Sequence, residues 1–218
     1  ILFTSGLQNV LMPAFSALAA EPARMASAFL RSSRTLLLVA TFITGAFIAV
    51  CPEILQALWS GKWNAAVPVA LAIAFSLPFK LLAPLGTSLL DAKGVWRQRT
   101  LILPMDGLPA GASALAGAWY AGVAGAAVAI AAQRCLMGLF QACYSARCAN
   151  ISRSVIASLV TRGILPLLAG LGLLMIQPAS LTSAPADIGP LAIAALVKAA
   201  TFLAGWFFTA RLLNREAF

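Results

Sequence analysis

Apolar stretches of about 20 residues recur along the whole chain, and they constrain its fold more than any other feature. A membrane-spanning helix needs ~20 mostly apolar residues, because it rises ~1.5 Å per residue and the hydrocarbon layer is ~30 Å thick. None of the stretches alternates apolar and polar residues, as the strands of a membrane β-barrel would. We predict seven spanning helices, at residues 1–18, 35–54, 65–90, 101–120, 122–141, 155–176 and 188–210.

The composition supports this interpretation. Of the 218 residues, 61% are hydrophobic and 10% are charged, whereas about 25% of the residues in a soluble domain are charged. A chain this apolar could not cover a surface that faces water. The predicted fold class is therefore an all-α polytopic membrane helical bundle with about seven transmembrane helices. Because the first apolar stretch is already under way at Ile1, we expect the first helix to be truncated and the chain to be a C-terminal fragment.

The basic residues give the predicted orientation. Ten of the 15 lie at 19–34, 91–100, 142–154 and in the tail from 211, whereas the connections on the other side hold only Lys62. By the positive-inside rule, the first group and the C-terminus face the cytoplasm. Trp59, Trp63, Trp119 and Tyr120 fall near the opposite boundary, where an aromatic belt is expected.

Several classes of function find no support in the composition. The net charge is +9, but the basic residues are scattered singly and form no block that would bind nucleic acid. The chain has no histidine, the commonest metal ligand and general base. Its four cysteines have no metal-binding or redox spacing. We therefore predict no metal, no cofactor and no catalytic residue.

Five charged residues lie well inside the predicted spans, away from their ends. Each costs at least ~2.5–3.5 kcal/mol at a helix centre. The two lysines lie ~16 Å and ~18 Å from the cytoplasmic boundary at ~1.5 Å per residue, which is too deep for their ammonium groups to reach water easily. They need a partner or a wet cavity. The five residues are Lys80, Asp106, Arg134, Arg162 and Lys198.

Lys80 lies between Pro78 and Pro84. Each proline removes a backbone donor, so we expect a kinked helix with free carbonyl groups. Such carbonyls are tolerated at membrane depth only against protein or water. We therefore interpret Lys80 as facing a cavity, where it would meet the substrate. The alternatives are a structural ion pair with Asp106 and a lysine that reaches the interface.

The other charged residues have similar alternatives. Arg134, Lys198 and Asp106 are further candidates for the cavity or for contacts that hold the bundle together, and Arg162 is expected at the interface. The small residues of 111–132 predict close packing of the fourth and fifth spans. A sliding interface between moving helices is the functional alternative.

Two stretches resemble a known family. They are VLMPAFSALAAEPARMASAFLRSSRTLLL, from Val10 to Leu38, and CPEILQALWSGKWNAAVPVALAIA, from Cys51 to Ala74. Both resemble the polysaccharide and lipopolysaccharide exporters, the O-antigen-type flippases of the multidrug/oligosaccharidyl-lipid/polysaccharide exporter superfamily. The similarity covers about residues 8–95, and the order of the later spans agrees with the family.

The resemblance implies a fold, a substrate and a location. The fold would be a two-lobed exporter of the bacterial inner membrane with a cavity between its lobes. Residues 1–146 would be part of the C-terminal lobe, and 147–218 would be two additional trailing helices. The substrate would be a lipid-linked oligosaccharide or polysaccharide precursor. The other partners would be membrane lipids and the missing N-terminal lobe, with no nucleic acid.

Two alternatives to a flippase stay open. A cation-coupled, multidrug-type exporter of the same superfamily would favour acidic groups in its cavity, but one acid, Asp106, stands against four bases among the charged residues well inside the spans. A membrane enzyme of polysaccharide biosynthesis would carry a sizeable polar loop with an acid–base pair. The predicted outer loop at 177–187 has only Asp187. We therefore expect a transporter that is not an enzyme.

Overall fold

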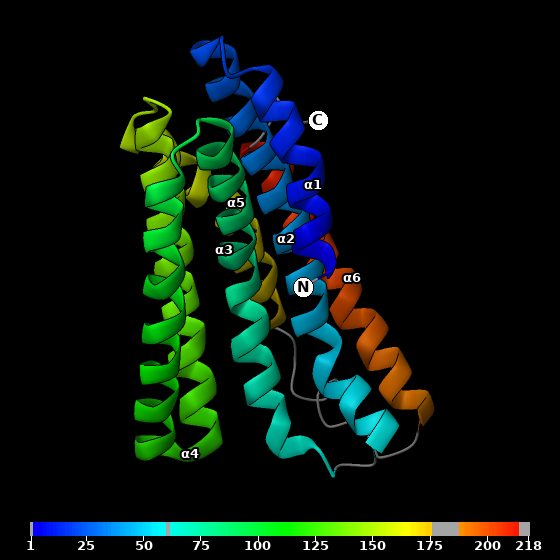
Figure 1. Ribbon diagram of the computed structural model, residues 1–218. Helices are drawn as coiled ribbons and strands as arrows, with labels where there is room; N and C mark the ends of the chain where they lie inside the picture. Colours follow the sequence, from blue (N-terminus) through cyan, green and yellow to red (C-terminus); the bar gives the residue numbers. More distant parts are fainter. Residues whose placement is uncertain (1, 60–61, 176–187, 214–218) are drawn as a thin grey trace.

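The computed structural model describes residues 2–59, 62–175 and 188–213, and these residues form helices and no strand. The predicted all-α class is therefore confirmed. Figure 1 shows the helices lying side by side as an elongated bundle. They are α1 (Leu2–Ala17), α2 (Pro22–Trp59), a short 3-10 turn (Asn64–Ala66), α3 (Val67–Ala92), α4 (Trp96–Cys148), α5 (Arg153–Met175) and α6 (Ile188–Leu213).

Five of the described helices, α2 to α6, are long and apolar enough to cross a membrane. These lengths and compositions are those of a multi-pass membrane protein. The number of seven spans is not confirmed. Helix α1 has 16 residues, fewer than the ~20 of a full span, and α4 is one element of 53 residues where two spans were predicted.

Helix α4 folds back on itself where the fourth and fifth spans were expected to meet. The backbone leaves the helical region at Ala121 (φ −142°, ψ 25°) and Gly122 (φ 62°, ψ −148°). The positive φ is readily adopted by glycine, which has no Cβ. Figure 1 shows the two arms of α4 running side by side from this turn. The predicted hairpin is therefore confirmed, with arms at 96–120 and 123–148.

Helix α2 begins earlier than predicted. The expected loop at 19–34 is mostly helical, because α2 starts at Pro22, a residue favoured at the first position of a helix. Arg24 forms an exposed ion pair with Glu21 at 3.1 Å. The prediction was wrong because it placed the end of the helix at the end of the apolar stretch, whereas a helix can continue beyond the membrane.

The connections with basic residues lie at one end of the bundle. Figure 1 shows the turn between α1 and α2 and the junctions α3–α4 and α4–α5 at this end, and the turn of α4 at the other. This arrangement agrees with the alternation of basic and non-basic connections. The assignment of the basic end to the cytoplasm stays a prediction. The predicted outer loop at 177–187 and the tail beyond 213 lie outside the described residues.

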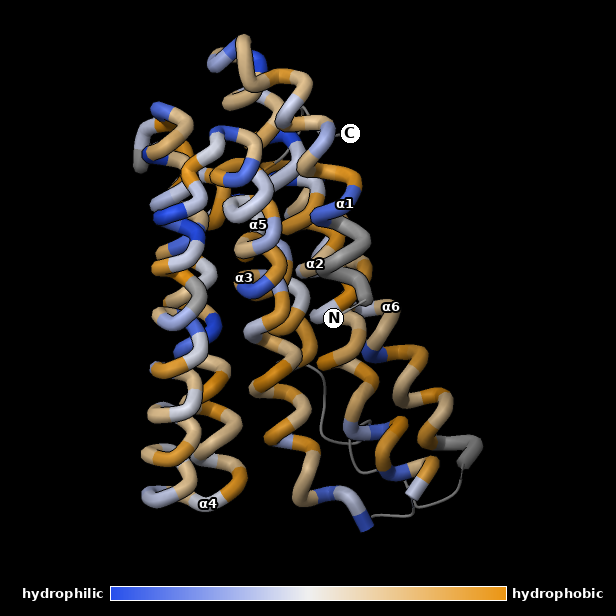
Figure 2. Tube along the Cα trace, viewed as in Figure 1, coloured by the Kyte–Doolittle hydropathy of each residue, from blue (hydrophilic) through white to orange (hydrophobic). Residues whose placement is uncertain are grey.

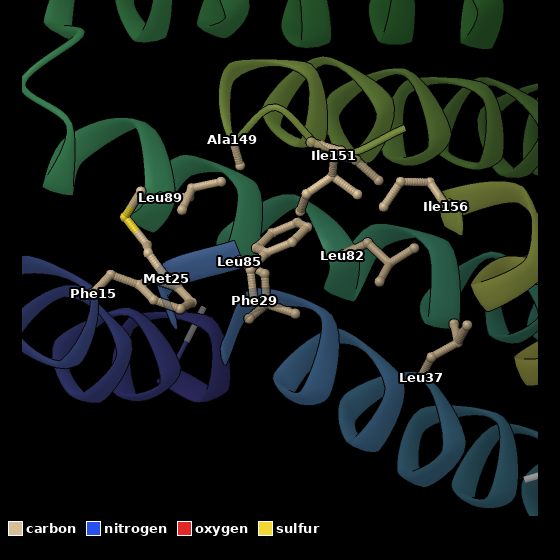
Figure 3. Packing of buried hydrophobic residues seen from close by; sticks show 12 residues of the cluster. Phe15, Met25, Phe29, Leu37, Leu82, Leu85, Leu89, Ala149, Ile151 and Ile156 are labelled. Atoms are coloured by element: carbon tan, nitrogen blue, oxygen red, sulfur yellow. The ribbon is translucent and has the colours of Figure 1, made fainter. Parts of the chain in front are cut away.

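The larger apolar core joins α1, α2 and α3 to the second arm of α4 and the start of α5 (Figure 3). Phe15 and Phe29 pack with their ring centroids 6.4 Å apart. Leu85 and Leu89 of α3 are almost completely buried beside them. This core fixes α3 between α2 and α4, and therefore fixes the side of α3 that carries Lys80.

A second core joins α2, α5 and α6. Phe202 is fully buried, and a Cβ at Gly45 would overlap its ring. Trp206 donates a hydrogen bond from Nε1 to Thr41 Oγ1 at 3.3 Å. Helices α5 and α6 are thus attached chiefly through α2. The division into a lobe at 1–146 and trailing helices at 147–218 stays a prediction.

Candidate functional site: a polar cavity between α1, α3 and α4

A partly open cavity of about 360 Å³ lies between α3, the two arms of α4 and α1. Figure 2 shows hydrophilic positions partway along α3 and α4, where most of the surrounding chain is apolar. Lys80, Asp106 and Arg134, three of the four charged residues predicted for a cavity, line it together. Arg99 lines it too. Lys80 and Arg134, which are 54 positions apart in the chain, thus line one site.

Lys80 lies in the middle of α3, 13 residues after its start at Val67 and 12 before its end at Ala92. At ~1.5 Å per residue this is about 18 Å from either end of the helix. Its side chain is exposed and makes no hydrogen bond or ion pair with the described residues. The ammonium group is therefore available to a ligand in the cavity.

Pro78 and Pro84 are both buried within α3, which continues through them. Pro84 has no N–H group to donate to the carbonyl of Lys80, four residues earlier. Lys80 and Pro84 both line the cavity. A free carbonyl and a free cation are thus expected at the same level of α3. The predicted kink itself stays a prediction.

Asp106 pairs with Gln133 rather than with Lys80. Gln133 Nε2 donates to the backbone oxygen of Asp106 at 3.1 Å and to its Oδ1 at 3.3 Å. These bonds link the two arms of α4. No ion pair joins Lys80 to Asp106 in the described part of the chain, so the structural-pair alternative gains no support.

Four uncharged polar side chains complete the lining. Gln8 Nε2 of α1 donates to Thr87 Oγ1 of α3 at 3.0 Å, which ties α1 to the edge of the cavity. Gln133 and Gln141 are 9% and 6% exposed, and the Oε1 atom of each is buried without a hydrogen-bond partner. Buried amide oxygens are normally satisfied, so these two are exceptions within the bundle.

The cavity carries an excess of positive charge. Arg99 is neutralised by Asp91, with Nη1 2.6 Å from Oδ2. Arg134 is half-buried and makes no ion pair with the described residues. Lys80 and Arg134 therefore stand against one carboxylate, that of Asp106. In a poorly hydrated site this excess favours an anionic ligand.

Lys198, the fourth predicted residue, does not line this cavity. It lies on α6 and forms an ion pair with Glu53 of α2. Glu53 is buried, and its Oε2 has no partner. The pair links two helices 145 residues apart in sequence, so its position indicates a structural role. The expectation of a single acid in the spans was also wrong, because Glu53 and Asp91 are both buried in spanning helices.

Sequence reasoning missed the uncharged half of the lining. Gln133, Met137 and Gln141 follow one another at intervals of four, which places them on one face of a helix. That spacing was a usable signal for a polar stripe. Gln8 and Thr87 gave no such signal, because their contact depends on how α1 docks onto α3.

The arrangement is suited to binding an anion. Within residues 2–59, 62–175 and 188–213, no three histidine, cysteine or acidic side chains lie close enough together to hold a metal ion. The cavity offers the ammonium group of Lys80 and the guanidinium group of Arg134, which match an anionic group such as a phosphate.

Comparisons with protein-family models, with characterised proteins and with solved structures found no match to this chain.

Proposed function

We propose that the chain is part of a membrane transporter that moves a lipid-linked oligosaccharide or polysaccharide precursor across the bacterial inner membrane. The observation that carries the proposal is the cationic cavity inside an apolar bundle. The resemblance of residues 8–95 to O-antigen-type flippases gives the substrate class, because the lipid carrier of such a substrate is linked to its sugar through pyrophosphate.

The positive charges of Lys80 and Arg134 explain why such a site would stabilise the pyrophosphate of this substrate. A pyrophosphate that enters an apolar bundle loses its hydration, which is costly unless charged partners replace it. Lys80 and Arg134 line the same cavity and have no other partner among the described residues. Hydrogen bonds between cationic donors and phosphate are about twice as strong as neutral ones.

A second candidate is a cation-coupled, multidrug-type exporter. Asp106 favours it, because this carboxylate is exposed on the cavity wall and could hold a cation. The two unpaired bases weigh against a cationic substrate. A polysaccharide-biosynthesis enzyme is supported less, because the cavity has one carboxylate and no histidine to act with it.

Depletion of the protein in its own cell tests the proposal. The expected result is loss of surface polysaccharide, with lipid-linked oligosaccharide accumulating on the cytoplasmic leaflet. Accessibility of the sugar to a glycosidase in sealed inside-out vesicles distinguishes the two leaflets. Unchanged polysaccharide together with increased sensitivity to cationic drugs would favour the second candidate and contradict the first.

A further inference from the structure

Arg99 is a third base on the wall of the cationic cavity, and Asp91 neutralises it. Arg99 Nη1 lies 2.6 Å from Asp91 Oδ2, and Arg99 lines the cavity together with Lys80 and Arg134. The side chain of Arg99 is 37% exposed, whereas that of Asp91 is 7% exposed. The guanidinium group therefore borders the open space, and the carboxylate that cancels its charge is buried.

Helix α3 does not by itself explain the position of Asp91. Asp91 is the penultimate residue of α3, which ends at Ala92, and a negative charge there faces the negative end of the helix dipole. Its carboxylate is buried, and Oδ1 has no hydrogen-bond partner among the described residues. A buried carboxylate is costly unless it is paired. The ion pair with Arg99 is therefore what compensates this charge.

The ion pair occupies only part of the guanidinium group. A guanidinium carries five N–H donors in a planar fork, and the Asp91 carboxylate accepts a hydrogen bond from Nη1. Other donors of the same group stay available on the side of the cavity. An anion in the cavity can therefore approach Arg99, but it meets a side chain whose positive charge is already balanced.

We propose that Asp91 limits the affinity of the cavity for an anion, because it competes with the anion for Arg99. The inference rests on the proposed function and deepens it, since it names the residue that controls how tightly the site holds its substrate. While Asp91 is charged, Lys80 and Arg134 supply the positive excess of the cavity. Without the charge of Asp91, the cavity gains the charge of Arg99 as well. A transported substrate must also leave its site, so a cavity that binds less tightly favours release.

The expected gain in affinity follows from Coulomb's law. An anion held by Arg134 lies near the level of Asp106, because the neighbouring Gln133 bonds to Asp106. Arg99 precedes Asp106 by seven residues on α4, which is ~10 Å along the helix. One unit charge at ~10 Å changes the affinity for a monovalent anion by about tenfold when the effective dielectric constant is ~20.

Calorimetric titration of the 218-residue chain with inorganic pyrophosphate, in nanodiscs of zwitterionic lipid, tests this proposal. Asp91→Asn removes the charge and keeps an oxygen that accepts a hydrogen bond from Arg99, so it should bind pyrophosphate at least about tenfold more tightly. Asp91→Ser is also uncharged and is smaller, and it should show the same gain. Adding Arg99→Gln to Asp91→Asn removes both charges and should return the affinity to that of the unaltered chain.

Glu21→Gln is the matched control for net charge. Glu21 forms an exposed ion pair with Arg24 in the turn between α1 and α2, which lies at the same end of the bundle as the junction of α3 and α4 (Figure 1). Neither Glu21 nor Arg24 is among the residues that line the cavity. This variant loses one negative charge, as Asp91→Asn does, and its affinity for pyrophosphate should equal that of the unaltered chain.

Three results would contradict the role of Asp91. Unchanged or lower affinity in both Asp91 variants, with Lys80→Ala still weakening binding, would overturn the inference and leave the proposed function in place. A gain that persists after Arg99→Gln, or that Glu21→Gln reproduces, would also overturn it, because the charge of Arg99 would not be its source. Absence of pyrophosphate binding by the unaltered chain and by both Asp91 variants would overturn the proposed function together with the inference.

Discussion

The contact between Gly117 and Gly125 allows the hairpin of α4 to be tested by a single substitution. A Cβ added at Gly117 would overlap the carbonyl oxygen of Gly125 and lie 2.8 Å from the Cβ of Ala129. A Cβ at Gly125 would overlap the carbonyl oxygen of Gly117 in return. Backbone atoms cannot move aside as a side chain can, so any larger residue must push the two arms apart.

The expected magnitude follows from two opposing terms. Replacing glycine by leucine inside a helix gains up to ~1 kcal/mol of helix propensity. Overpacking of a close contact costs ~1–3 kcal/mol, and a whole leucine side chain against backbone belongs at the upper end. We expect Gly117→Leu to lower the free energy of unfolding by about 2 kcal/mol.

Gly111→Leu is the matched control. Gly111 lies on the same arm, and a Cβ there would meet no atom within 4 Å. This variant gains the same propensity without the overlap, so its free energy of unfolding should stay the same or rise by up to ~1 kcal/mol. The difference between the two variants, about 3 kcal/mol, isolates the cost of separating the arms.

Unfolding by SDS in a mild detergent, followed by circular dichroism, measures both variants. We expect Gly117→Leu and Gly125→Leu to unfold at a lower SDS concentration than the unaltered protein. Gly111→Leu should not unfold at a lower concentration. Equal transitions for all three variants would refute the close approach of the arms.

Two further predictions concern the ion pair and the orientation of the chain. Glu53→Leu or Lys198→Met alone should lower the free energy of unfolding by about 3–5 kcal/mol, because each leaves a buried charge unpaired. The double variant should recover most of this lost free energy. A double variant as unstable as the single variants would exclude a purely structural pair. Reporter fusions after positions 95 and 150 should both be active on the cytoplasmic side, and a periplasmic signal from either would contradict the orientation.

The sequence predicted the elements set by local patterns. The turn at Ala121 and the close packing of the arms follow from apolar length and small residues. The charges placed in apolar segments indicated Lys80, Asp106, Arg134 and Lys198 as candidates for a cavity, but not which of them lie together. Helix α2 was predicted too short, because the length of an apolar stretch indicates only the part of a helix that lies inside the membrane, and the helix can extend further. Its continuation to Pro22 depends on residues outside that stretch.

The partners of the charged residues could not be predicted in this way. Lys198 pairs with Glu53 across 145 positions, and no local pattern encodes which helices become neighbours. Asp106 lies near Lys80 in the cavity but bonds to Gln133 instead, because the arms of α4 lie close to each other. Side-chain pairing in a bundle depends on helix packing, which apolar periodicity alone does not specify.

Transport of a lipid-linked oligosaccharide by Lys80 variants, in the cell of origin, tests the central claim most directly. Lys80→Ala should be inserted normally, but its export rate should fall by at least about tenfold, because a hydrogen bond to a charged group contributes ~1.5–3 kcal/mol. Lys80→Arg should keep part of the activity, and Asp106→Asn, which retains an oxygen to accept from Gln133, should change it little. Export by Lys80→Ala at the normal rate would contradict the account.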